Sequence, residues 1–149
     1  CSEEEIQAIH WAMLLHDIGK IGIADGILLN PGPLSKEEWI QMEQHPDIGA
    51  KIVAPVKKLA NVAPLIRSHH ERFDGKGYPD SLKGEDIPLL ARILSVADVY
   101  DALTTDRSYR QKMSDNVAVE IIRESAGSQF DPKIVGVFLD LHSNGEIKN

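Results

Sequence analysis

Residues 69–79 read HHERFDGKGYP, and the interpretation of the whole chain starts from this stretch. His69 and His70 end a predicted helix, and a loop with a Gly-Tyr-Pro turn follows them. Neighbouring residues of a helix lie about 100° apart around its axis, so one helix end can present two imidazoles to two adjacent positions. Imidazole is the commonest metal-binding side chain in proteins. Taken alone, the pair is equally typical of a solvated helix end.

A second histidine motif lies near the N-terminus, where residues 16–20 read HDIGK. Ser2 and Glu5 form the pattern of a capping box, which predicts a helix start, and Gly19 predicts the end of that helix. His16 and Asp17 therefore fall in its last turn, where the helix dipole favours a cation. Residues 21–34 contain several glycines and prolines and predict a long ordered loop that packs across the core.

The remaining pattern predicts helices only. A capping box at Ser35 opens a helix that should end near His45, because Pro46 disfavours the α conformation in the residue before it. The other predicted helices are residues 46–54, a helix capped by Asn61 that ends at His70, a long apolar helix after Pro88, and two that start at Ser114 and Asp131. We expect one all-α domain of about six or seven helices.

Composition narrows the range of functions. A chain of 149 residues is long enough for one domain with a real core, and its net charge of -7 argues against binding to nucleic-acid polymers or anionic membranes. Cys1 is the single cysteine, so an intrachain disulfide is excluded and a reducing cytoplasm is the expected compartment. No apolar run approaches the roughly 20 residues of a membrane span. A first residue other than Met suggests part of a longer protein.

Several side chains from distant segments form a set of candidate metal ligands. Asp98 lies on an otherwise apolar helix face, and a buried carboxylate needs a cation or a hydrogen-bond donor. A mixed nitrogen and oxygen set suits iron, manganese or zinc. Six candidate ligands are more than one tetrahedral zinc ion binds. They fit two metal ions about 3.5–4 Å apart, with Asp17 as the candidate bridging ligand. The candidates are His16, Asp17, His45, His69, His70 and Asp98; His10 and His142 are interpreted as structural.

The two histidine motifs together resemble a known family. HDIGK is similar to the HD signature of metal-dependent phosphohydrolases, and residues 69–79 are similar to the HHExxDGxGYP signature of the HD-GYP subgroup. The resemblance continues through His45-Pro46, the helix with Asp98 and Asp101, and residues 106–110, which read DRSYR. It implies an HD-GYP domain over residues 1–142, followed by a short tail at 143–149. The family hydrolyses the bacterial second messenger cyclic di-GMP to linear pGpG and GMP.

The resemblance also implies roles for single residues. The six candidate ligands correspond to the family's metal ligands, and Asp17 and Lys20 correspond to catalytic positions, with Lys20 meeting the phosphate. Gly77, Tyr78, Arg107 and Arg110 correspond to positions that hold substrate. The implied cofactors are two divalent ions, or three, with iron or manganese ahead of zinc, nickel and magnesium.

One departure from the family leaves alternatives open. The family has an earlier helix with another histidine ligand and, in trinuclear members, a glutamate, and this chain begins too late to contain it. If that helix is absent, the apolar groove it would cover favours a homodimer. Expected partners are an upstream receiver or sensory domain and diguanylate cyclases. The alternative functions are a non-catalytic docking module and a phosphohydrolase acting on another cyclic nucleotide such as cyclic GMP-AMP.

Overall fold

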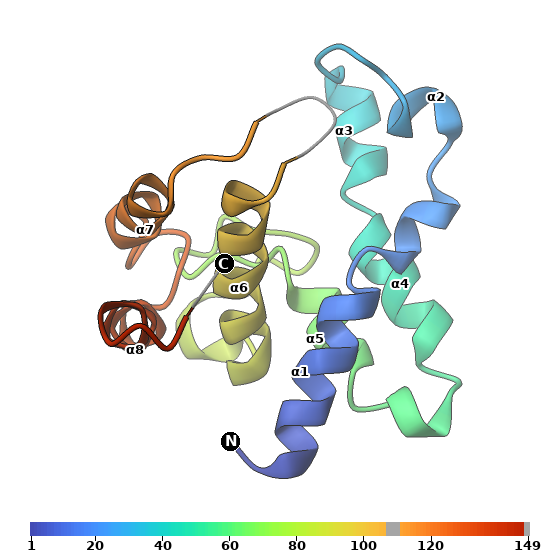
Figure 1. The fold of residues 1–149 in the computed structure, drawn as a ribbon. Coiled ribbons are helices and arrows are strands. Elements are labelled where there is room, and N and C mark those ends of the chain that lie inside the picture. The colour runs from blue at the N-terminus through green and yellow to red at the C-terminus, as the bar shows by residue number, and fades with distance from the viewer. Residues whose placement is uncertain (107–110, 148–149) are drawn as a thin grey trace.

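Both predicted capping boxes start helices in the computed structural model, which describes residues 1–106 and 111–147 (Figure 1). Helix α1 (Glu3–Leu15) begins after Ser2, and α3 (Lys36–Met42) begins after Ser35. In each case the serine hydroxyl accepts a hydrogen bond from the backbone N–H of a glutamate, whose carboxylate accepts one from the serine N–H. Two N-terminal donors of each helix are thereby satisfied.

The expected all-α architecture is confirmed. The described residues contain seven α-helices longer than one turn, the one-turn helix α2, and three short 3-10 helices, but no strand. Apart from α1 and α3, the elements are, in chain order, η1 (Ile18–Gly22), α2 (Asp25–Leu28), α4 (His45–Val53), η2 (Lys57–Leu59), α5 (Ala63–Ser68), η3 (Gly84–Asp86), α6 (Leu89–Thr104), α7 (Asp115–Glu124) and α8 (Pro132–Ser143).

Local details differ from the sequence predictions. Residues 21–34 are not one extended loop, because η1 ends within them and the Ala24 carbonyl accepts the N–H groups that close the single turn of α2. Ile23 and Ile27 are buried against the core, but Leu29 is 74% exposed, so only part of the segment packs there. His45 opens α4 instead of ending α3, and Val62 rather than Asn61 precedes α5.

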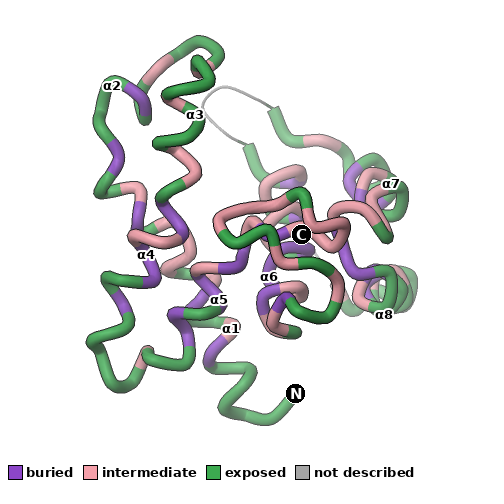
Figure 2. The backbone as a smooth tube through the Cα atoms, turned by 180° about the vertical axis from the view of Figure 1, so that it is seen from behind, coloured by how far each residue is buried: buried purple, intermediate pink, exposed green. Residues whose placement is uncertain are grey.

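Two hydrophobic clusters meet at α6. The first joins α1, α4 and α5 to the N-terminal half of α6, and the second joins its C-terminal half to α7 and α8. Helix α6 is apolar over most of its circumference, as expected for a helix between two cores. Figure 2 shows buried segments where these helices meet and exposed residues at the N-terminal end of α1. The shared helix fixes the two halves relative to each other.

Polar contacts attach α8 to the other helices. Arg92 of α6 donates to the buried carboxylate of Asp131 at 2.5 Å, and the same carboxylate caps α8 by accepting from the Lys133 N–H. His142, in the last turn of α8, bonds Asp115, which also accepts from the Tyr100 hydroxyl. Helix α8 ends one residue beyond the expected boundary at 142, and Ile147 still packs against the second core.

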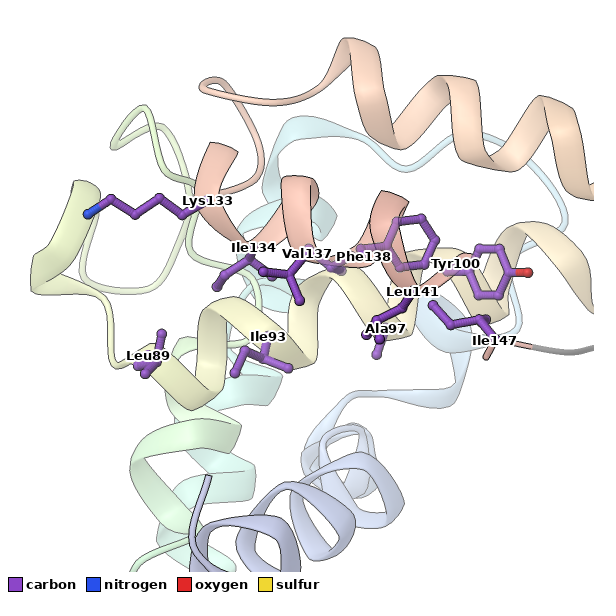
Figure 3. Close-up of a pocket in the computed structure, with 11 residues that line it drawn as sticks. Leu89, Ile93, Ala97, Tyr100, Lys133, Ile134, Val137, Phe138, Leu141 and Ile147 are labelled. Atoms are coloured by element: carbon purple, nitrogen blue, oxygen red, sulfur yellow. The ribbon is translucent and has the colours of Figure 1, made fainter. Parts of the chain in front are cut away.

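An apolar groove of about 450 Å³ runs along α6 and α8 (Figure 3). Its only charged lining residue within the described chain is Lys133, and it contains no carboxylate or imidazole. Hydrolytic chemistry therefore has to be sought elsewhere. Within residues 1–106 and 111–147, no helix has the length and apolar character needed to cross a bilayer.

Candidate metal centre

Three histidines at helix ends are held in the same way. His16 follows α1, His45 follows α3 at the start of α4, and His69 follows α5. Each Nδ1 bonds a backbone carbonyl three residues earlier; the acceptors are Met13, Met42 and Ile66, at 2.8, 2.8 and 2.6 Å. Such carbonyls near a helix end lack a helical partner. Because Nδ1 must donate to a carbonyl, Nε2 of each ring carries the free lone pair.

The free nitrogens fit a metal ion. Among the described residues, Nε2 of His45 and Nε2 of His69 are buried and have no hydrogen-bond partner. An unsatisfied buried nitrogen is costly, about 1–3 kcal/mol, so such a pair requires an explanation. Metal-binding histidines commonly donate their second ring N–H to a backbone carbonyl, as these do. The donor set of this centre is therefore suited to a divalent transition metal.

Asp17 lies between two of the histidines. Its Oδ1 is 3.4 Å from Nε2 of His45, and its Oδ2 is 3.5 Å from Nε2 of His16 and 2.7 Å from Nζ of Lys20. The two oxygens thus face different imidazoles, which is the arrangement of a bridging carboxylate. Asp98 approaches from α6, with Oδ1 3.4 Å from Nε2 of His16.

The structure brings all six candidate ligands together. Ligand atoms of Asp17, His45, His69 and His70 lie within 4.8 Å of one another, and His16 links Asp98 to them. The ring centroids of His69 and His70 are 4.0 Å apart, so the two consecutive imidazoles lie side by side at this site. We refer to His16, Asp17, His45, His69, His70 and Asp98 as the metal cluster.

The Gly-Tyr-Pro turn places an aromatic ring beside the cluster. The Tyr78 and His70 ring centroids are 4.8 Å apart. A Cβ on residue 77 would lie 2.4 Å from the Arg72 nitrogen and 2.5 Å from the His70 oxygen, so only glycine fits there. Gly77 therefore acts by close backbone packing that brings Tyr78 to the cluster. Arg107 and Arg110 lie outside the described residues.

Burial favours the neutral form of three of the histidines. It lowers the pKa of His69 to about 4, and burial together with the neighbouring His69 lowers the pKa of His70 to about 2. Burial also lowers the pKa of His45. For Asp17, burial raises the pKa, but its neighbours, above all the Lys20 ammonium that donates a hydrogen bond to it, outweigh this effect and hold the pKa below its ordinary value. Neutral imidazoles and an ionised carboxylate are the forms that bind metals.

Sequence reasoning missed two residues that shape this region. Glu71 is buried, and its carboxylate accepts from the N–H groups of Asp80 and Leu82, which fixes the loop around Tyr78. Gln129 comes from the connection between α7 and α8 and lines a cavity of about 240 Å³ beside His70 and Asp98. Glu71 is part of the quoted motif and could have been singled out. No local pattern marks Gln129, because only folding brings it there.

Comparisons with known proteins found a matching family model and several similar proteins. The family model described as HD domain matches residues 1–134. The cyclic di-GMP phosphodiesterase response regulator RpfG of Xanthomonas campestris is 45% identical over 140 residues, which are 93% of this chain and 37% of that protein. The 3′3′-cGAMP-specific phosphodiesterase 2 of Vibrio cholerae is 42% identical over 141 residues, 93% of this chain and 27% of that protein.

A solved structure has a similar fold. The crystal structure of a cyclic GMP-AMP-specific phosphodiesterase of V. cholerae, V-cGAP3, superimposes with a TM-score of 0.67 at 27% identity, covering 97% of this chain and 40% of that one. The chain spans 29%, 37% and 30% of the length of three curated relatives that are named as cyclic di-GMP phosphodiesterases, one of them as probable. The resemblance drawn from the two histidine motifs is confirmed by these matches.

Proposed function

Because the chain belongs to the HD domain family, whose phosphohydrolases are metal-dependent, we propose that it is a phosphodiesterase that hydrolyses cyclic di-GMP to linear pGpG, GMP or both. The observation that carries this proposal is the metal cluster. Nε2 of His45 and Nε2 of His69 are buried there without a hydrogen-bond partner in the described chain, close to the carboxylate of Asp17. An HD-GYP domain over residues 1–142 and a cytoplasmic location are parts of the same proposal.

The proposed cofactors are two divalent ions, or three, with iron or manganese preferred by the mixed nitrogen and oxygen ligands. The two oxygens of Asp17 face His16 and His45, which supports a bridging role for this carboxylate. When bound, such ions supply a water acidified toward hydroxide and spread the charge of the phosphate oxygens. His16, His45, His69, His70 and Asp98 would hold them.

Residues of the chain itself position the substrate. The Lys20 ammonium lies 2.7 Å from Asp17 Oδ2 and can interact with a phosphate oxygen or the departing ribose oxygen at the edge of the cluster. Tyr78 offers an aromatic face beside His70 for a base. Arg107 and Arg110 retain their proposed role of binding the second phosphate or a guanine edge.

Two other functions are separated from this one by experiment. Hydrolysis of cyclic GMP-AMP is the second candidate, because a relative named for that specificity is 42% identical over 93% of this chain. A non-catalytic docking module would have no need of six converging ligands. Receiver or sensory domains, diguanylate cyclases and a second copy of the chain are the partners proposed for the longer protein.

The direct test is hydrolysis by the purified, metal-loaded protein. Manganese or ferrous iron is added, and products from cyclic di-GMP and 3′3′-cGAMP are separated by chromatography. We expect turnover of cyclic di-GMP and a loss of at least about 100-fold in Asp17→Ala, because that change removes the shared ligand. His10→Ala, an exposed histidine, is the matched control. A metal-loaded protein that cleaves neither dinucleotide would support the docking module.

A further inference from the structure

A polar cavity adjoins the metal cluster on the side of Tyr78. It measures about 240 Å³ and shares His69, His70 and Asp98 with the cluster. Its other walls come from the loop after His70, from α6 and, through Gln129, from the connection between α7 and α8. A substrate whose phosphate lies at the cluster would therefore have one neighbouring group in this cavity.

The polar side chains around the cavity differ in whether their hydrogen-bonding groups have partners in the protein. Arg72 donates two hydrogen bonds to Asp74, at 3.2 and 3.0 Å, and Ser95 donates to the Arg92 carbonyl at 3.0 Å. The side-chain amide of Gln129, in contrast, has no hydrogen bond to any other described residue. Its donor and acceptor are both free to meet a ligand.

The backbone holds Gln129 firmly in place. Its carbonyl accepts from the Phe73 N–H at 3.1 Å, and its N–H donates to the Ser125 carbonyl at 3.0 Å. The next residue, Phe130, is 1% exposed and anchors the connection in the second core. The amide is thus presented to the cavity by a fixed backbone, as a recognition group needs to be.

The geometry points to Gln129 as a residue that reads a nucleobase of the substrate, an inference that rests on the proposed function. A phosphate group would bind at the cluster, where Lys20 and the proposed metal ions carry positive charge. A neutral amide instead pairs with a base edge that offers one donor and one acceptor. The Watson–Crick edge of guanine offers O6 and N1–H in this way. The Tyr78 ring and the Val99 side chain give the cavity apolar surface for the faces of the base.

The test compares two phosphodiesters that differ in whether they carry bases. In Gln129→Ala, we expect the ratio of kcat/KM for cyclic di-GMP to kcat/KM for bis(p-nitrophenyl) phosphate to fall roughly 10- to 100-fold, which is the discrimination given by a bidentate amide–base pair. Gln129→Met keeps the approximate shape but can neither donate to O6 nor accept from N1–H, so the ratio should fall in this variant also. Gln7→Ala, an exposed glutamine on α1, is the matched control.

Metal content and equilibrium binding of cyclic di-GMP are measured on the same variants. We expect unchanged metal content and weaker binding in both Gln129 variants. Equal losses for the two substrates would overturn the inference, because they would mean that Gln129 only positions the metal cluster. Unchanged binding and kinetics would also overturn it. If the unaltered protein cleaves only bis(p-nitrophenyl) phosphate, the proposed function fails, and the binding comparison still tests Gln129.

Discussion

Lys20 places a positive charge at the solvent-exposed side of the metal cluster. Its ammonium lies 2.7 Å from Oδ2 of Asp17 and is about a third exposed, so it can meet a substrate from solvent while it holds the carboxylate ionised. Within the described chain, Lys20 pairs with Asp17 at the exposed side of the cluster. In the proposed function, Lys20 therefore links Asp17 to a phosphate of the substrate.

Replacing Lys20 should separate metal binding from turnover. We expect Lys20→Ala to lower kcat for cyclic di-GMP by about 100- to 1,000-fold, as for loss of one charge-stabilising donor, while metal content stays the same. Metal analysis and steady-state kinetics measure the two effects. Lys57→Ala removes an exposed lysine of η2 and serves as the control. Unchanged kcat would exclude Lys20 from the reaction.

The buried histidines predict how acid affects the metal-free protein. Burial lowers the pKa of His69 from 6.5 to about 4, so between these values the unfolded chain binds a proton that the folded chain does not. The free energy of unfolding should therefore fall as the pH falls from 6.5 toward 4, by up to about 1.4 kcal/mol per pH unit for each such histidine.

Urea titrations of the metal-free protein at several pH values measure this slope. His70→Asn removes one half-buried imidazole, whose pKa is lowered to about 2 by burial and by the neighbouring His69, and should give a shallower slope. His10→Asn changes an exposed histidine and should keep the slope of the unaltered protein. Parallel slopes in all three proteins would contradict the assignment of the effect to the cluster.

At the scale of elements, the packing of η1 against α4 brings the HD motif to His45. Gly19 is the contact point, because a Cβ there would lie 1.9 Å from the His45 carbonyl oxygen and 2.5 Å from the Gly49 nitrogen. Both neighbours are backbone atoms and cannot rotate away. Gly19 therefore does more than end a helix, because its lack of a side chain lets two of the ligand-bearing segments pack in direct contact.

Gly19→Ala should separate η1 from α4. We expect a loss of about 3 kcal/mol or more in the free energy of unfolding, because overpacking against backbone has no side-chain relief. Gly136→Ala is the matched control, since its added methyl meets nothing within 4 Å in the middle of α8. That change should stabilise by about 0.5–1 kcal/mol. Denaturant titration of both variants gives the comparison, and equal small effects would exclude the tight contact.

For the whole molecule, the metal cluster joins segments that are far apart in sequence. His16 and Asp17 follow α1, His45 opens α4, His69 and His70 follow α5, and Asp98 lies in α6. All four helices contribute to the first hydrophobic core. Ions bound only by the folded state would therefore stabilise this half of the molecule as a unit.

Metal removal should lower the melting temperature. At a free ion concentration of 100 times Kd, binding stabilises by about 2.7 kcal/mol, which corresponds to roughly 5–10 °C for a domain of this size. Calorimetry with manganese and then with excess EDTA measures the shift. His69→Ala should lose most of it, and His10→Ala should retain it. An EDTA-insensitive melting temperature would contradict metal binding at the cluster.

Local sequence patterns were enough to predict the helical fold, the two capping boxes and the six candidate ligands. The helix ends are local features, because Ser, Gly and Pro mark them within a few residues, and every candidate ligand except Asp98 lies at or just beyond such an end. The folded structure was needed to show that the six side chains converge, that backbone carbonyls orient three imidazoles, and that Gln129 reaches the cavity. The convergence and the position of Gln129 depend on contacts between residues distant in sequence, and such contacts leave no periodic pattern in the chain. Each imidazole–carbonyl bond joins residues three apart and depends on how the helix ends in the folded chain.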